Sequence, residues 1–136
     1  MKLTVTHLQS YLPHNLVCLV NNHYATLSGL YTDGEVVFFD LVESQHGFQS
    51  IKPLLRPLSE YQDINSPAMQ ELNEDLGTLI HINELANRET LLSSIPYYVA
   101  QVCFENHIDV FNLINHDLAL SITEERKKHE RLDKTS

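Results

Sequence analysis

Short apolar segments separated by tight-turn signals fill the first half of the chain, and this pattern constrains the fold more than any other feature. The segments are rich in β-branched and aromatic residues, the types that favour strands; they are residues 16–20, 24–31 and 36–42. Asn21-Asn22 and Asp33-Gly34 separate them, and Asp-Gly is a strong signal for a tight hairpin turn. The pattern predicts an antiparallel β-meander, with a fourth strand over 48–51.

The third predicted strand is apolar on both faces. Successive side chains of a strand point to opposite sides, which gives one set made of Val37, Phe39 and Leu41 and another made of Val36 and Phe38. A strand of this kind is normally covered on both faces. We expect helices to cover one face. Either a curled, barrel-like sheet or a homodimer through the sheet face covers the other.

The second half of the chain predicts helices. Two prolines make 52–58 an extended connector. Ser66 before Pro67 is typical of a helix N-cap and first helical position, and Gly77 marks the end of that helix. The segment 79–82 fits either a strand returning to the sheet or the start of a helix, and we favour a short strand followed by a helical turn.

The clearest predicted helix covers 95–106. Ser94 is its expected cap and Pro96 lies in its first turn. Helical spacing aligns an apolar stripe, which consists of Ile95, Tyr98, Val99, Val102 and Cys103. A second helical segment is expected over 110–115.

These elements predict an α+β fold. The chain has 136 residues, which fits one hydrophobic core and not two. We predict a single domain over 1–123, in which an antiparallel meander of three to four short strands precedes helices that pack on the sheet. The charged run 124–136 has no apolar stripe, so we expect a frayed or disordered tail.

The charge distribution excludes an ordinary duplex-binding protein. The net charge is −9, and residues 60–123 hold one base, Arg88, and ten acids. Because proteins bind duplexes through lysine and arginine contacts to phosphates, we expect no double-stranded nucleic acid partner. The aromatic residues of the meander resemble a stacking surface for single strands, but the basic groove that such a surface needs is missing. A solvated acidic face explains the charge most simply, and a basic partner protein is the alternative.

The sequence predicts a cytoplasmic protein with no membrane partner. No stretch approaches eighteen apolar residues, and the N-terminal residues lack the apolar core of a secretory signal. Cys18 and Cys103 each lie within an apolar segment, which predicts buried, reduced thiols.

Eight histidines raise the question of a metal site. The candidate ligands form two groups, which are His107, Asp109, His116 and Asp117 near the C-terminus and His7, His14 and His23 near the N-terminus. Zinc ligands usually occur as close local pairs, and neither group shows that spacing. The chain also lacks a Gly-x-Ser-x-Gly nucleophile motif and a glycine-rich phosphate loop. We predict no catalytic, cofactor-binding or metal-ligating residue.

Two segments carry a family resemblance, and they read IKPLLRPLS at 51–59 and FENHIDVFNLI at 104–114. Both resemble segments of a family of small uncharacterised proteins encoded by phages and prophages of gut bacteria. The chain departs from the family pattern at 107–109, where Phe-Asp is usual, and at 115–117, where a turn ending in glycine is usual. The resemblance implies a phage-related origin in a bacterial host cell and an α+β fold. It implies no activity.

The sequence therefore favours a non-enzymatic protein-interaction or regulatory module of phage or prophage origin. Such a module presents its acidic 60–117 region or an apolar sheet face to a protein partner. The alternative is a small metal-dependent hydrolase that uses the C-terminal histidines and aspartates. An assembly component with repeated self-contacts is a third hypothesis.

Overall fold

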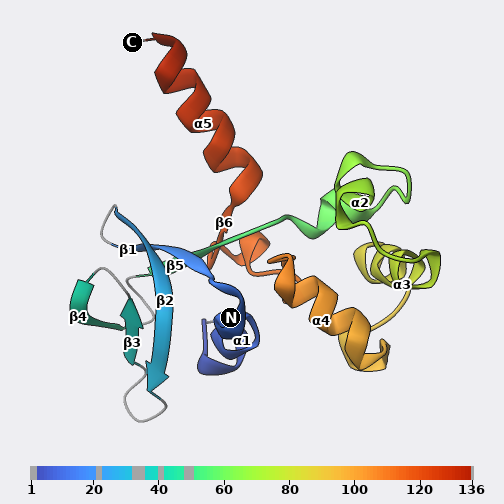
Figure 1. Cartoon of the computed structure of the whole chain (residues 1–136), viewed down its shortest axis with the longest axis horizontal. Helices are drawn as coiled ribbons and strands as arrows, with labels where there is room; N and C mark the ends of the chain where they lie inside the picture. Colours follow the sequence, from blue (N-terminus) through green and yellow to red (C-terminus); the bar gives the residue numbers. More distant parts are fainter. Residues whose placement is uncertain (1–2, 21–22, 32–35, 40–41, 48–50, 136) are drawn as a thin grey trace.

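The computed structural model describes residues 3–20, 23–31, 36–39, 42–47 and 51–135, and within them the chain forms an open mixed sheet and a set of helices (Figure 1). The strand order is β4-β3-β2-β1-β5-β6, and all neighbours are antiparallel except β5 and β6. The strands are β1 (Val17–Val20), β2 (His23–Tyr31), β3 (Val36–Phe39), β4 (Val42–Gly47), β5 (Ile51–Leu55) and β6 (Leu120–Ser121). The predicted α+β class and N-terminal strands are confirmed, and the sheet does not close into a barrel.

The start of the meander follows the prediction. Val20 of β1 pairs with His23 of β2, and Tyr31 of β2 pairs with Val36 of β3. The two turns predicted between these strands, at 21–22 and around Asp33-Gly34, lie outside the described residues.

The prediction of a single third strand over 36–42 is wrong. β3 ends at Phe39, β4 begins at Val42, and these two residues pair with each other. The chain thus reverses within a run whose nearly continuous apolar composition gives no sign of a break except Asp40. The side-chain faces predicted for this run, and the homodimer inferred from them, lie outside what the structure describes.

The predicted connector 52–58 is also partly a strand. β5 occupies Ile51–Leu55, between β1 and β6, whereas we predicted the fourth strand over 48–51, of which only Ile51 is described. Pro53 pairs with Cys18 of β1, while the pairing with β6 begins one residue later, at Leu54. Pro53 therefore has a neighbouring strand on one side only, which is where a sheet tolerates a residue without an N–H.

The helices among the described residues are α1 (Val5–Tyr11), α2 (Pro67–Leu72), α3 (Leu76–Ala86), α4 (Tyr97–Glu105) and α5 (Ile122–Thr135). Short 3₁₀ turns connect them, namely η1 (Leu12–His14), η3 (Leu58–Tyr61), η4 (Leu92–Ser94) and η5 (Ile114–His116). The predicted start of α2 is confirmed, because the Ser66 hydroxyl accepts a hydrogen bond from the Met69 N–H at 3.2 Å.

The predicted end of this helix is wrong. α2 stops at Leu72 because Asn73 takes a left-handed backbone conformation, with φ 53°. Asp75 then caps a new helix, accepting from the Thr78 N–H at 3.3 Å. Gly77 therefore lies in the first turn of α3.

The strand favoured over 79–82 is wrong for the same reason, since these residues lie inside α3. Thr78, Ile82, Leu85 and Ala86 are buried, a spacing that places them on one helical face.

Three predictions further along the chain need correction. α4 begins at Tyr97 after Pro96, and Ser94 ends η4 and does not cap it. Residues 110–115 do not form a helix, because Asn112 takes a left-handed conformation, with φ 59°. Residues 124–135 of the charged run belong to α5. The Ser121 hydroxyl accepts from a first-turn N–H at 3.3 Å, and lysine, arginine and glutamate favour helix even without an apolar stripe.

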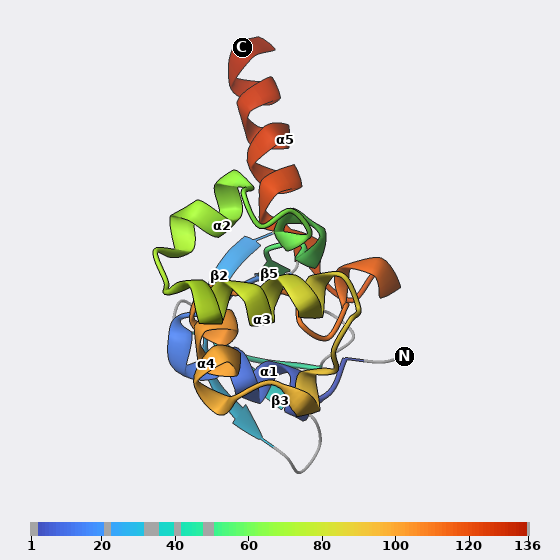
Figure 2. The same ribbon diagram turned by 90° about the vertical axis from the view of Figure 1, so that its right-hand side faces the viewer.

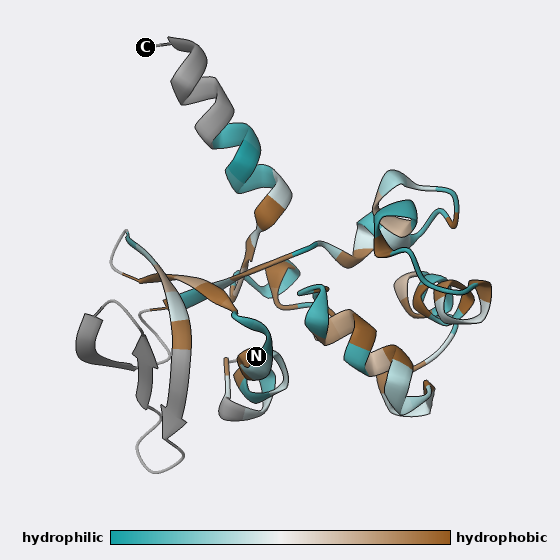
Figure 3. Cartoon of the chain, in the orientation of Figure 1, coloured by the Kyte–Doolittle hydropathy of each residue, from teal (hydrophilic) through white to brown (hydrophobic). Residues whose placement is uncertain are grey.

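Buried residues form two clusters, and the helices and strands that contribute to them form two neighbouring groups (Figures 1 and 2). One joins α1 to β1, β2 and β5. The other joins η3, α2, α3 and α4 and contains no strand residue. Phe104 and Phe111 pack against both clusters, and α5 projects away from the body, with hydrophilic residues over its first turns after Ile122 (Figure 3). It remains a prediction that 1–123 fold as one domain.

Candidate functional site

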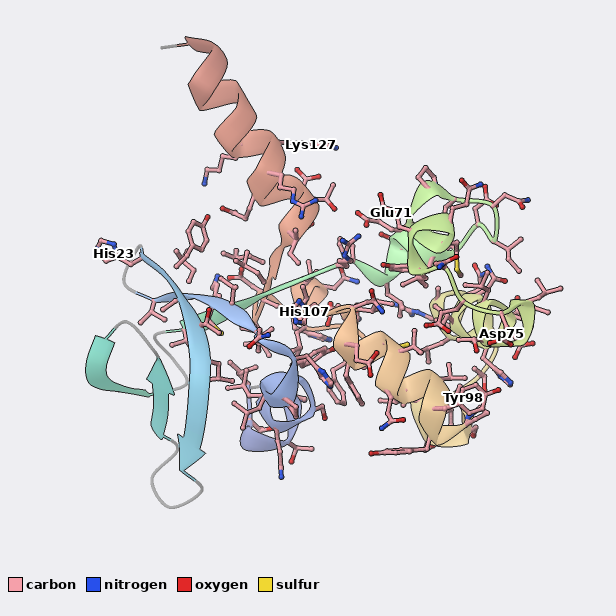
Figure 4. The ribbon with its side chains drawn as sticks, in the orientation of Figure 1. His23, Glu71, Asp75, Tyr98, His107 and Lys127 are labelled. Carbon is pink, nitrogen blue, oxygen red and sulfur yellow. The ribbon has the colours of Figure 1, made fainter. Side chains whose placement is uncertain are left out.

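The segment 107–114 lies between the two clusters and carries two of the candidate ligands, His107 and Asp109. It pairs with the residue after β5: the Arg56 N–H donates to the His107 carbonyl at 2.7 Å, and the Asp109 N–H donates to the Arg56 carbonyl at 2.9 Å. Ile108, between them, is fully buried. The candidate residues are therefore held by a short parallel continuation of the sheet, between the sheet and the helices (Figure 4).

His107 makes a structural hydrogen bond. Its Nε2 lies 2.6 Å from the backbone carbonyl oxygen of His14, and because a carbonyl only accepts, Nε2 carries the proton and donates. Burial lowers the pKa of His107, and this hydrogen bond opposes the shift. The ring thus fastens η1 to the 107–114 segment through Nε2.

Asp109 caps the turn that follows it. The residue is only 2% exposed; Oδ1 accepts from the Leu113 N–H at 2.8 Å and Oδ2 accepts from the Ile114 N–H at 2.9 Å. Burial raises the pKa of Asp109, and the two N–H donors act in the opposite direction. Both oxygens thus hold the backbone, which is the arrangement of a local cap and not of a free general base.

Tyr11 links α1 to the same segment. Its hydroxyl donates to the Ile108 carbonyl at 2.5 Å and accepts from the Val110 N–H at 3.4 Å. Its ring meets Phe104 and Phe111 edge-on, with centroids 5.2 and 6.2 Å apart. Burial raises the pKa of Tyr11 well above its ordinary value. The contact therefore joins the two hydrophobic clusters through a neutral phenol.

The other candidate ligands do not complete a metal site with His107 and Asp109, although His7 and His116 both lie near enough to Asp109 to lower its pKa. His7 Nδ1 accepts a backbone N–H at the start of α1, and burial lowers the pKa of His7. Asp117 forms a surface ion pair with Lys52 at 2.8 Å, and His116 is exposed. Figure 4 shows His23 at the outer end of the β1–β2 hairpin, away from His107. Over the described ranges, no group of three or more His, Cys, Asp and Glu side chains can hold a metal ion.

The two cysteines are buried free thiols, as predicted. Cys18 belongs to the cluster around the sheet and Cys103 to the cluster around the helices. Burial raises the pKa of each thiol from 9.0 to about 12. Both are therefore protonated at neutral pH and poor nucleophiles.

The most prominent surface feature is a set of exposed apolar side chains on the helical part of the chain. Six large apolar or aromatic residues are exposed among the parts of 3–27 and 51–128 whose side-chain burial the structure describes, and all but Tyr24 lie between positions 76 and 98. We call these five the 76–98 face; they are Leu76, Ile80, Leu91, Tyr97 and Tyr98.

The sequence pattern did not predict this face, and the prediction that Tyr98 belongs to the buried stripe of α4 is wrong. Tyr98 is 53% exposed and Tyr97 is 77% exposed, while Val99 and Cys103 are fully buried. The correct stripe thus repeats every four residues. The available signal was the Tyr97-Tyr98 pair. Consecutive residues of an α-helix point in different directions, so the two rings cannot both lie in one buried stripe.

A cleft of about 460 Å³ lies between α2, η3 and the first turns of α5. Its charged groups are largely paired with one another: Arg56 contacts Glu71 at 3.2 Å, and the Thr123 hydroxyl donates to Glu60 at 2.6 Å. These contacts are structural, and they do not indicate a reaction in the cleft.

No helix in the described part of the chain is long and apolar enough to cross a membrane. No family model, curated protein or solved structure matches the chain.

Proposed function

We propose that the chain is a non-enzymatic protein-interaction module of phage or prophage origin, and that the 76–98 face docks a basic partner protein. The observation that carries this proposal is the concentration of five exposed large apolar side chains within one short stretch of an otherwise acidic segment. Exposed apolar side chains that gather in one part of a chain are a typical feature of protein-interaction sites.

The residue types of the face suit an interface. Leu76 and Ile80 lie one turn apart on α3, on the same side of the helix. Tyr97 and Tyr98 begin α4, and tyrosine is enriched at protein interfaces because it supplies a large contact area with a polar tip.

The charges around the face select the partner. Glu74 and Asp75 directly precede Leu76, and Glu89 lies close to Leu91 in the sequence; all three acids are exposed. Arg88 is the single base among residues 60–123, against ten acids. A protein with basic residues around an apolar patch complements this arrangement and is steered toward it.

No comparable observation favours the hydrolase alternative. His107 and Asp109 hold backbone groups, and Asp117 is paired with Lys52. Three of the four candidate side chains thus take part in structural contacts, and the fourth, His116, is exposed.

The test places a photo-cross-linking phenylalanine analogue at Tyr98 and, as a matched control, at Gln9, an exposed residue of α1. Both proteins are expressed in infected or lysogenic bacteria and irradiated. We expect a discrete adduct with a basic protein from position 98 only, and its loss when Leu76→Ser and Ile80→Ser are added. Identical adducts from both positions, or none from position 98, would contradict the proposal.

A further inference from the structure

Arg88 has a backbone conformation that does not suit arginine. Six residues other than glycine have a positive φ among the described residues. Five are of types that tolerate this region, namely Asn15, Asn73, His107, Asn112 and Asp117. The sixth is Arg88, with φ 60°.

Hydrogen bonds identify why the backbone turns at this residue. The Arg88 N–H donates to the Leu85 carbonyl at 3.2 Å, and the Glu89 N–H donates to the Glu84 carbonyl at 2.8 Å. This pair of bonds is the Schellman motif, which ends a helix with a left-handed residue that is usually glycine. An arginine here costs conformational free energy that glycine does not, and such strain is commonly retained where the side chain has a function.

Arg88, an exposed residue, lines a pocket of about 420 Å³ between η3, the end of α3, η4 and the 110–115 segment. This volume lies within the range of small-molecule sites. Leu85, Leu92 and Val110 supply apolar surface, and Thr90 and Asn112 supply polar groups. The Asn115 amide donates to Asn112 Oδ1 at 2.6 Å, which leaves the Asn112 NH₂ group as the donor.

The charge of the pocket is opposite to that of its surroundings. No aspartate or glutamate lines it, although the segment 60–123 holds ten acids. Arg88 is the only base of that segment, and no ion pair to another described residue occupies it.

We propose that this Arg88 pocket binds an organic carboxylate that carries a short apolar group. The guanidinium accommodates a carboxylate through two parallel hydrogen bonds, and the leucines and Val110 cover the apolar group. The same chemistry is offered by a free small acid and by the C-terminus of a polypeptide. The proposal does not rest on docking at the 76–98 face.

The test measures amide chemical shifts of the whole chain during titration with four probes. The first two are 4-methylpentanoate and its neutral amide, 4-methylpentanamide. The other two are N-acetyl-glycyl-leucine with a free carboxylate and with a C-terminal amide. We expect saturable shifts around Arg88 and Asn112 with a carboxylate probe and not with its amide. Tighter binding of 4-methylpentanoate identifies a small acid, and tighter binding of the peptide acid identifies a chain terminus.

Variants separate binding from folding. Arg88→Gly removes the guanidinium and relieves the left-handed strain, so we expect a thermal midpoint raised by a few degrees and affinity lowered roughly tenfold or more. Arg88→Gln keeps a long side chain and is expected to lose the same affinity. Asn73→Gly, a matched change at another left-handed helix end, should leave affinity unchanged. Equal binding of acid and amide, unchanged affinity in Arg88→Gly, or no saturable shift with either acid overturns the proposal.

Discussion

Raising the pH above 9 is expected to destabilise the protein through its two buried thiols. Cys18 and Cys103 titrate at about 12 in the folded chain, against 9.0 for an unperturbed thiol. Between these values the unfolded state loses the thiol protons and the folded state keeps them. The free energy of unfolding therefore falls as the pH rises through this window, and below pH 9 the thiols contribute their full stability.

The size of the effect follows from the shift. Each thiol lowers the free energy of unfolding by about 1.4 kcal/mol per pH unit once the unfolded thiol is fully ionised. At pH 9 only part of the unfolded thiols is ionised. Between pH 9 and 10 each thiol therefore lowers the free energy of unfolding by about 1 kcal/mol, and the pair lowers it by about 2 kcal/mol. Both residues are 0% exposed, so solvent does not screen the effect of these pKa shifts on stability.

Urea denaturation at pH 8, 9 and 10 measures this dependence. Cys18→Ala and Cys103→Ala each remove one thiol, and we expect each variant to lose about half of the thiol-dependent decrease, whatever its stability at pH 8. Because unperturbed tyrosines titrate near pH 10, the difference between wild type and variant isolates the thiol. A decrease of the same size in the double variant would refute the reasoning.

Three further perturbations test the contacts of the 107–114 segment and one helix cap, each by urea denaturation. Asp109→Ala leaves two backbone N–H groups without acceptors and is expected to cost about 3 kcal/mol, whereas Asp109→Asn keeps one acceptor and should cost about 1 kcal/mol. Burial lowers the pKa values of His7 and His107. Their contribution to stability is therefore present above pH 6.5 and lost as the pH falls through their folded-state pKa values. Replacing both with Gln should flatten this dependence of the unfolding free energy on acid pH, and an unchanged slope contradicts the prediction. Ser66→Ala removes the cap of α2 and should cost about 1 kcal/mol, with Ser93→Ala, an exposed residue of η4, as the neutral control.

The sequence predicted those elements whose signals are local. β1 and β2 follow from apolar composition and flanking turn residues, and the start of α2 follows from Ser66-Pro67, because a cap needs only the residues next to it. Residues 79–82 were misassigned because a short apolar run fits both strand and helix. The cap at Asp75 and the burial of Ile82 decide in favour of helix, and burial depends on residues distant in the chain.

The arrangement of the candidate site depends on tertiary contacts even more than the assignment of helices and strands does. The sequence offered no signal that His107 of the C-terminal group hydrogen-bonds the backbone of His14 in the N-terminal group. That His107 and Asp109 hold backbone groups follows only once Arg56 pairs with their segment. The exposure of Tyr98 and the left-handed backbone of Arg88 are likewise set by packing and helix termination, and neither residue type predicts them.

The most direct test of the central claim maps binding to the 76–98 face residue by residue. An amphipathic helical peptide with leucines on one side and lysines on the other is added to the labelled protein, and amide chemical shifts are followed. The account predicts that the perturbed amides cluster at 76–80, 91 and 97–98, that added salt weakens the binding, and that Tyr97→Ser with Tyr98→Ser abolishes it. Perturbations centred on β1, β2 or α1, or unchanged binding by the double variant, would contradict it.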